Sequence, residues 1–190
     1  MNYCIEVMKE EHANIKRMVT VIRQICCNIL EGSEVPVSDF RNITDFIKNY
    51  ADHHHHGKEE AFLFPEMVSR LGKTADNLVT HGMLVEHNLG RNYNMGLGMA
   101  LNAYEASPST QLKLDIVGNA FGYAYVLSEH ILKENNVVYP FAEKNLPAEI
   151  LDKVNEDSKK YEEETMLKGV QRHYLDMLES LEKKYGISML

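Results

Sequence analysis

The sequence contains few of the features that mark secreted or membrane-spanning proteins. It has no Trp, three Cys and five Pro among 190 residues. Because two of the three Cys are adjacent, at Cys26 and Cys27, they do not form a disulfide framework, and reduced thiols are expected. No apolar run reaches the roughly 18 residues that a membrane span needs, and the acidic N-terminus does not resemble a signal peptide. These absences favour a cytoplasmic protein.

The sequence also has fewer basic than acidic residues. The formal net charge is −8, with 28 acidic against 20 basic residues. Nucleic-acid binding selects basic surfaces, so neither a nucleic-acid nor a membrane partner is expected. A length of 190 residues predicts one main domain with a full hydrophobic core.

Long segments with helical periodicity make up most of the chain. Apolar residues recur at steps of three and four, and no segment alternates with period two over the length of a strand, which predicts an all-α protein. Gly, Ser and Pro clusters separate the segments. The expected helices cover residues 3–31, 37–70, 74–104, 111–143 and 148–185.

The short connections between these helices predict an up-down-up-down four-helix bundle over residues 1–146. The fifth helix lies in a C-terminal helical extension, residues 147–190, which carries many Glu and Lys and a thinner apolar stripe. We expect this extension to pack on the bundle or on a partner, and a homodimer through it is one option.

Nine His are the unusual part of the composition, and an internal repeat separates four of them from the rest. Displacing the sequence by 75 positions aligns polar residues that otherwise appear scattered. The aligned pairs are Glu11 with Glu86, His12 with His87, His55 with His130, Lys58 with Lys133, Glu59 with Glu134, and Phe64-Pro65 with Tyr139-Pro140. Two related helical hairpins are therefore expected.

The repeated polar residues are typical of a metal site. His12 interrupts an apolar stripe, and a buried polar group is costly unless it is paired or bound to a metal. Residues four apart share a helix face, so His55 and Glu59 can point at one centre. The repeat then predicts a dinuclear site, and its mixed N and O donors fit iron, manganese or zinc better than calcium. The candidate ligands are His12, His55, Glu59, His87, His130 and Glu134.

The run of four His at residues 53–56 requires a choice. The 43-residue spacing shared by both halves selects His55, although His56 also has a Glu four residues on. His54 and His56 are expected behind the ligands or in solvent, so replacing His56 should cost less metal than replacing His130. His81 and His173 are expected at the surface.

These motifs resemble the hemerythrin-like HHE cation-binding family. The resemblance rests on Glu11-His12, on HHGKEEAFLFP at 55–65, on MLVEHNLGR at 83–91 and on HILKENNVVYP at 130–140. It implies a four-helix bundle with a non-heme di-iron centre, oxo- or hydroxo-bridged, held by the same six ligands. Glu59 and Glu134 would bridge the irons, and manganese or zinc could replace iron.

The resemblance also implies a function. The protein would bind or react with O₂, NO or peroxide in stress response, detoxification or sensing, and carrier and enzyme stay open as alternatives. Oxygen-carrying members have five His and two carboxylates, with paired His on the third helix. Met83 stands where a second His would lie, so the set resembles a six-ligand subgroup. The alternatives are a zinc- or manganese-binding structural bundle, or repair and donation of iron for damaged iron–sulfur centres.

Overall fold

The computed structural model describes residues 2–187, and within that range every regular element is helical. The all-α prediction is therefore confirmed. The elements are α1 (Tyr3–Leu30), α2 (Val37–Phe46), η1 (Ile47–His56), η2 (Glu59–Leu63), α3 (Phe64–Leu78), η3 (Val79–Met83), α4 (Leu84–Ala106), α5 (Thr110–Lys133), η4 (Glu134–Val138), α6 (Tyr139–Asn145), α7 (Ala148–Leu167) and α8 (Val170–Lys184). The η segments are π-helical.

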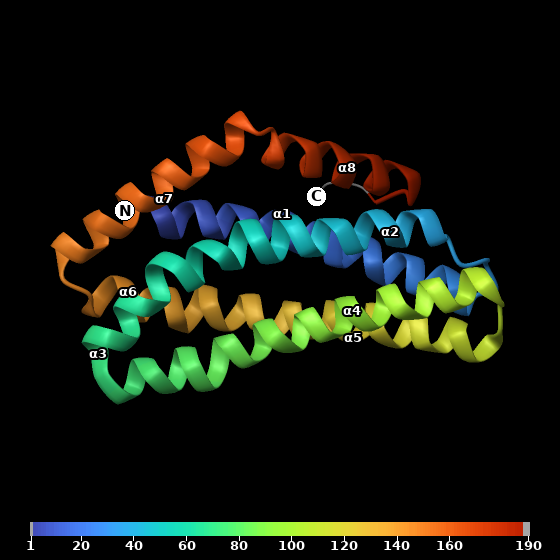
Figure 1. Cartoon of the computed structure of the whole chain (residues 1–190), viewed down its shortest axis with the longest axis horizontal. Helices are drawn as coiled ribbons and strands as arrows, with labels where there is room; N and C mark the ends of the chain where they lie inside the picture. Colours follow the sequence, from blue (N-terminus) through green and yellow to red (C-terminus); the bar gives the residue numbers. More distant parts are fainter. Residues whose placement is uncertain (1, 188–190) are drawn as a thin grey trace.

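The first six α-helices and the η segments form the predicted antiparallel bundle (Figure 1). α1 and α4 run in one direction, while α2–α3 and α5–α6 run in the other. α5 packs against both α4 and α1, and α2 packs against α4. The sequence predicted a helix end at residues 71–73, and Gly72, with a φ of +66°, provides it.

Two hydrophobic clusters fill the bundle and leave a polar layer between them. Along α1, Met8 belongs to one cluster and Ile15 to the other, and Glu11 and His12 lie in between. Both of these polar residues are buried. The core is therefore interrupted at the level where the sequence predicts a metal site.

The sequence predicted continuous α-helices, but the bundle helices contain π-helical segments. η1, η2, η3 and η4 have the wider i→i+5 turn of a π-helix, which occurs often at functional sites. η2 and η4 stop just before the Phe64-Pro65 and Tyr139-Pro140 pairs, and α3 and α6 continue the helices through both prolines. Because Pro donates no backbone hydrogen bond, it disturbs the regular ladder at these points.

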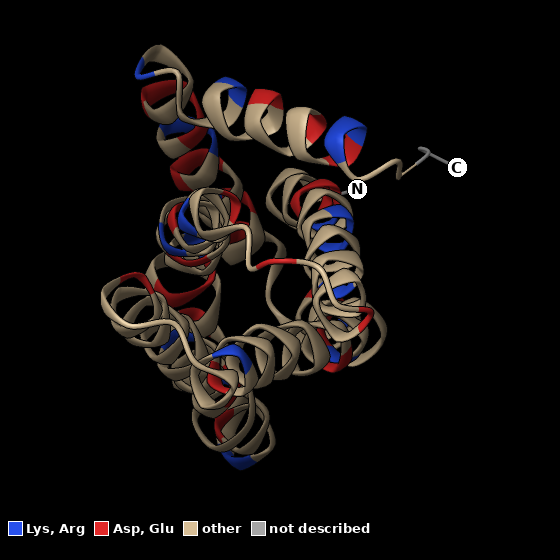
Figure 2. Ribbon diagram, turned by 90° about the vertical axis from the view of Figure 1, so that its right-hand side faces the viewer, with Lys and Arg blue, Asp and Glu red and all other residues tan. Residues whose placement is uncertain are grey.

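The C-terminal extension is two helices rather than the single one predicted. Gly169, with a φ of +72°, separates α7 from α8. The extension packs on its own bundle, mainly along α1 (Figure 1), and α7 also contacts η2 while α8 contacts α2. Charged residues of both signs are interspersed along it (Figure 2). Among the described residues, no helix is long and apolar enough to span a membrane.

Candidate metal centre

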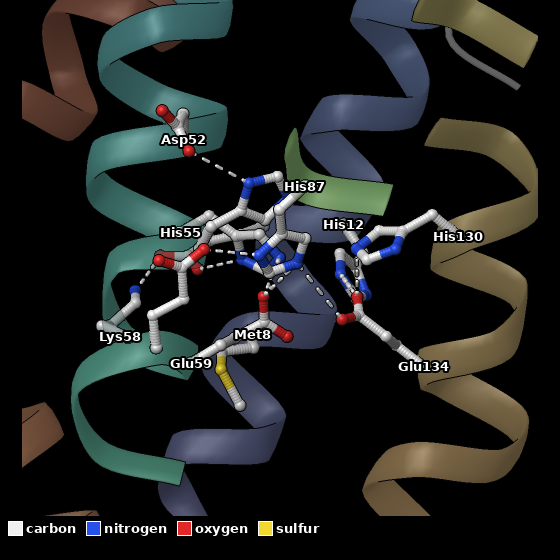
Figure 3. Close-up of polar contacts among 12 residues, drawn as sticks. Met8, His12, Asp52, His55, Lys58, Glu59, His87, His130 and Glu134 are labelled. Carbon is white, nitrogen blue, oxygen red and sulfur yellow. Dashed lines mark hydrogen bonds and ion pairs between the residues drawn. The ribbon is translucent and has the colours of Figure 1, made fainter. Parts of the chain in front are cut away.

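Five His and two Glu occupy the polar layer of the bundle (Figure 3). They form two overlapping groups, and within each group the ligand atoms all lie within 4.8 Å of one another. Every one of these side chains is at least 96% buried. The first group is His56, Glu59, His87 and His130, and the second is His12, His55, Glu59 and Glu134.

The seven side chains come from elements that are far apart in the sequence. α1 provides His12, α4 provides His87, and α5 provides His130. The π-helical segments provide the remaining four, which are His55 and His56 from η1, Glu59 from η2 and Glu134 from η4. The site is therefore assembled only when both hairpins are packed together.

The two carboxylates lie between the imidazole groups. Glu134 Oε2 is 3.1 Å from Nε2 of both His12 and His130. Glu59 Oε2 is 3.5 Å from His87 Nε2 and 3.9 Å from His55 Nε2. Each carboxylate thus faces imidazoles of both groups, which is the arrangement needed to bridge two cations.

The inner atoms of the site face one another at close range but form no hydrogen bonds of regular geometry. The Nε2 atoms of all five His are buried without one, and so are Glu59 Oε2 and both oxygens of Glu134. A buried polar atom without a partner costs about 1–3 kcal/mol. Several such atoms converging on one point are satisfied together by cations that accept their lone pairs. The residues present therefore fit a metal centre.

The outer nitrogen of each imidazole, by contrast, has an oxygen partner. Each contact orients its ring, and a proton on the outer nitrogen leaves the lone pair of Nε2 pointing inward. The Nδ1 contacts are His12 with Asn135 Oδ1 at 2.9 Å, His55 with Glu11 Oε2 at 2.9 Å, His56 with Asp52 Oδ1 at 3.4 Å, His87 with Glu60 Oε1 at 2.7 Å, and His130 with Glu86 Oε2 at 3.0 Å.

Burial sets the charge of the imidazoles of η1. Burial and the neighbouring His12 lower the pKa of His55 to about 3. Burial and His87 hold the pKa of His56 well below its usual range. Both rings are therefore neutral at pH 7, which is the form that binds a metal.

The pKa values of Glu59 and Glu134 shift in opposite directions because the two carboxylates share one buried space. Burial and the charge of Glu134 raise the pKa of Glu59 well above its usual range. Burial is the largest effect on Glu134 and opposes its ionisation, but His130, His12 and His87 together outweigh burial and hold the Glu134 pKa well below its usual range. The apparent pKa of His130 rises in turn to about 9, against the effect of burial. A cation between the carboxylates would allow both to ionise.

A cavity of about 280 Å³ adjoins the site on the side of His56 and His87. Gly90 and Tyr123 are among the residues that line it. Arg91 lies at the same cavity and binds both Asp52 and Glu60, the oxygen partners of His56 and His87. Two of the candidate donors, His56 and His87, thus lie at the wall of this cavity.

All six sequence-predicted ligands come together, and the structure adds His56 as a seventh donor. The sequence interpretation placed His56 behind the ligands or in solvent, whereas in the structure its Nε2 lies with the inner atoms. The total of five His and two carboxylates is the number expected of oxygen carriers, but the extra His comes from η1, and Met83 takes no part.

His81 and His173 lie at the surface, as predicted: His173 is exposed, and the His81 side chain is 68% exposed. His53 is exposed as well. His54 is buried behind the ligands, with its Nε2 2.8 Å from Glu11 Oε1. Together with Glu11 and Glu162, His54 forms a third group of side chains of the kind that bind metals.

This third group already holds a cation of the chain itself. Lys58 Nζ lies between Glu11 Oε1 and Glu162 Oε1 and contacts both. The ammonium therefore fills the position that a metal would need, and we do not assign a metal to this group.

The remaining members of the repeat support the ligands. Glu11 contacts both His55 and Lys58, and Glu86 contacts both His130 and Lys133. Sequence reasoning aligned these Glu and Lys residues without assigning them a role. Because these residues share the displacement of 75 positions with the candidate ligands, the repeat could have indicated that they support those ligands.

Comparison with known proteins agrees with this geometry. A search of curated proteins gives no significant match. The sequence does match the family model described as Hemerythrin HHE cation binding domain, over residues 4–142. This range contains all seven inner donors and ends before the extension of α7 and α8. The chain therefore belongs to the hemerythrin HHE cation-binding domain family.

Proposed function

We propose that this protein holds two iron ions in a non-heme centre that binds or reacts with O₂, NO or peroxide. The observation that carries the proposal is the set of five unpartnered Nε2 atoms converging on two shared carboxylates. Bound iron would supply the redox and ligand-binding chemistry. His56, His87 and His130 would hold one ion, His12 and His55 the other, and Glu59 and Glu134 both.

The donor set supports iron over a structural zinc site. A structural zinc site takes four donors around one ion, commonly including Cys. Here seven N and O donors surround a shared space, and the three Cys lie outside both groups. Imidazole and carboxylate together suit iron or manganese. Zinc in the purified protein would argue for the structural alternative.

The protein's own residues would orient the ligands and exclude water. Tyr139 donates a hydrogen bond of 2.6 Å to Glu59 Oε1, which fixes the oxygen that does not face the imidazoles. The Tyr139 ring also stacks on His12, with centroids 5.6 Å apart. Met8 and Phe64 belong to the buried apolar cluster that includes Tyr139. The centre is therefore dry on this side and accessible from the cavity beside His56.

Anaerobic titration tests this function and separates a binder from an enzyme. The reduced, iron-loaded protein is exposed to O₂, NO and peroxide in turn, and its optical spectrum is followed. We expect a new absorption band with at least one of the three. A stable adduct indicates a binding protein, and repeated consumption of the added molecule indicates an enzyme. An unchanged spectrum with all three would contradict the proposal.

A further inference from the structure

The two halves of the repeat support the metal centre through equivalent Lys–Glu pairs, Lys58 with Glu11 in the first half and Lys133 with Glu86 in the second. These two pairs differ in their surroundings. In the second half, Lys133 contacts Glu86, and its side chain is 48% exposed. In the first half, the equivalent Lys58 has a side chain only 1% exposed and contacts Glu162 as well as Glu11. Glu162 belongs to α7, which lies outside the repeat and outside the matched range of residues 4–142.

Glu162 is held firmly within the extension. Its Oε2 accepts a hydrogen bond of 2.9 Å from Gln171 Nε2 on α8, and the same amide donates to Thr165 Oγ1 at 2.8 Å. These bonds cross the break at Gly169 between α7 and α8. The position of the Glu162 carboxylate therefore depends on how the two helices of the extension meet.

A second contact fixes the same side of η1 to α7. The Tyr161 hydroxyl donates a hydrogen bond of 3.0 Å to the backbone oxygen of His53. The Tyr161 ring stacks on His54, with centroids 5.6 Å apart. The segment that bears His55 and His56 is thus fixed against α7 by both backbone and side-chain contacts.

We propose that Glu162 is a positioning residue for the metal centre. It holds Lys58, Lys58 holds Glu11, and Glu11 orients the ring of His55 through Nδ1. The C-terminal extension thereby supports the His55 half of the centre, while the His130 half depends on residues of the bundle alone. This inference rests on the proposed metal centre.

Removing the Glu162 charge should change the environment of the His55 ring and leave that of the His130 ring unchanged. In Glu162→Gln, the Lys58 ammonium loses one of its two carboxylates and pulls more strongly on Glu11. The matched control is Glu164→Gln, an exposed position on the same helix. Nitrogen-resolved NMR of the imidazole rings in the metal-free protein reports each ring separately. Because Glu11 contacts His54 as well as His55, the signals are assigned by replacing the rings themselves, in His55→Gln and His130→Gln.

We expect Glu162→Gln to move the His55 signals and leave those of His130 in place. In the cobalt(II)-loaded protein, transfer of cobalt to a chelator should be about 3–10-fold faster, since loss of a direct partner of a ligand typically costs about 10–100-fold. Glu162→Asp, which keeps the charge, should restore part of the difference, and Glu164→Gln should behave as the parent protein.

Two outcomes would overturn this inference. One is a change in Glu162→Gln that affects all five imidazoles alike or lowers only the melting temperature. The other is a Glu162→Gln protein that cannot be distinguished from Glu164→Gln. A chain that takes up no cation contradicts the proposed function instead, and the imidazole spectra of the metal-free protein still decide the role of Glu162.

Discussion

Each imidazole of the centre is oriented by one contact on its outer nitrogen. Four of the five partners are carboxylates, and the fifth is the amide oxygen of Asn135. A carboxylate accepting from Nδ1 raises the basicity of the ring and strengthens Nε2 as a metal ligand. His12 is therefore the one inner His whose outer nitrogen has no carboxylate partner.

The role of His56 can be tested against its own neighbour in the sequence. His56→Ala removes an inner donor, and we expect the bound metal to fall from two ions per chain to about one. His53→Ala is the matched control, because His53 belongs to the same run and is exposed. Elemental analysis of both variants measures the difference. Full metal content in His56→Ala would return His56 to a supporting role.

The two Lys of the repeat should differ in their effect on stability. Lys58→Met leaves Glu11 and Glu162 facing each other without a cation, and breaking a buried pair in this way costs about 3–5 kcal/mol. Lys133→Met removes an exposed pair and should cost less than about 1 kcal/mol. Urea unfolding of the metal-free proteins measures both. Equal losses would contradict the difference in burial seen here.

At the scale of the elements, the repeat explains which donors the sequence predicted, and the π-helical segments explain which one it missed. In each half two His lie 43 positions apart and a Glu follows the second His by four, and the halves are displaced by 75 positions. This pattern predicted six donors, because equivalent positions of two hairpins face the same core. The prediction assumed regular α-helical turns, in which adjacent residues diverge. In η1 the wider turn directs both His55 and His56 inward, one to each group.

The extension was predictable in composition but not in shape. The apolar stripe of residues 148–185 predicted a helix. Ile150, Val154 and Leu181 of that stripe are buried, whereas Met166 is 65% exposed. The break at Gly169 was missed because a Gly within a helical pattern is usually tolerated. The pairing of Glu162 with Lys58 joins residues 104 positions apart, and no local pattern indicates it.

At the scale of the whole molecule, the extension also covers the start of α1. The Cys4 backbone N–H donates to Asn155 Oδ1 of α7 at 3.0 Å, and the thiol is buried. Burial raises the pKa of both Cys4 and Cys26 to about 11, so both thiols are protonated and shielded at pH 8. Cys27 alone is exposed among the three.

Thiol reactivity therefore reports whether α7 is docked. A thiol reagent at pH 8 should modify one Cys in the native protein and three in urea. Val154→Asp places a charge in the buried contact of α7 and should make Cys4 reactive, giving two modified thiols. Met166→Asp is the control, since Met166 is 65% exposed. If Val154→Asp still shows one reactive thiol, α7 does not need this contact to remain docked.

The number of iron ions per chain tests the central claim most directly. The protein is purified without added metal, loaded anaerobically with ferrous iron, and freed of loosely bound ions before elemental analysis. The arrangement of five His around two shared carboxylates predicts about two ions per chain, retained in His53→Ala and reduced in His87→Ala. One ion per chain in the parent protein would contradict a dinuclear centre, and a value near zero would contradict the site altogether.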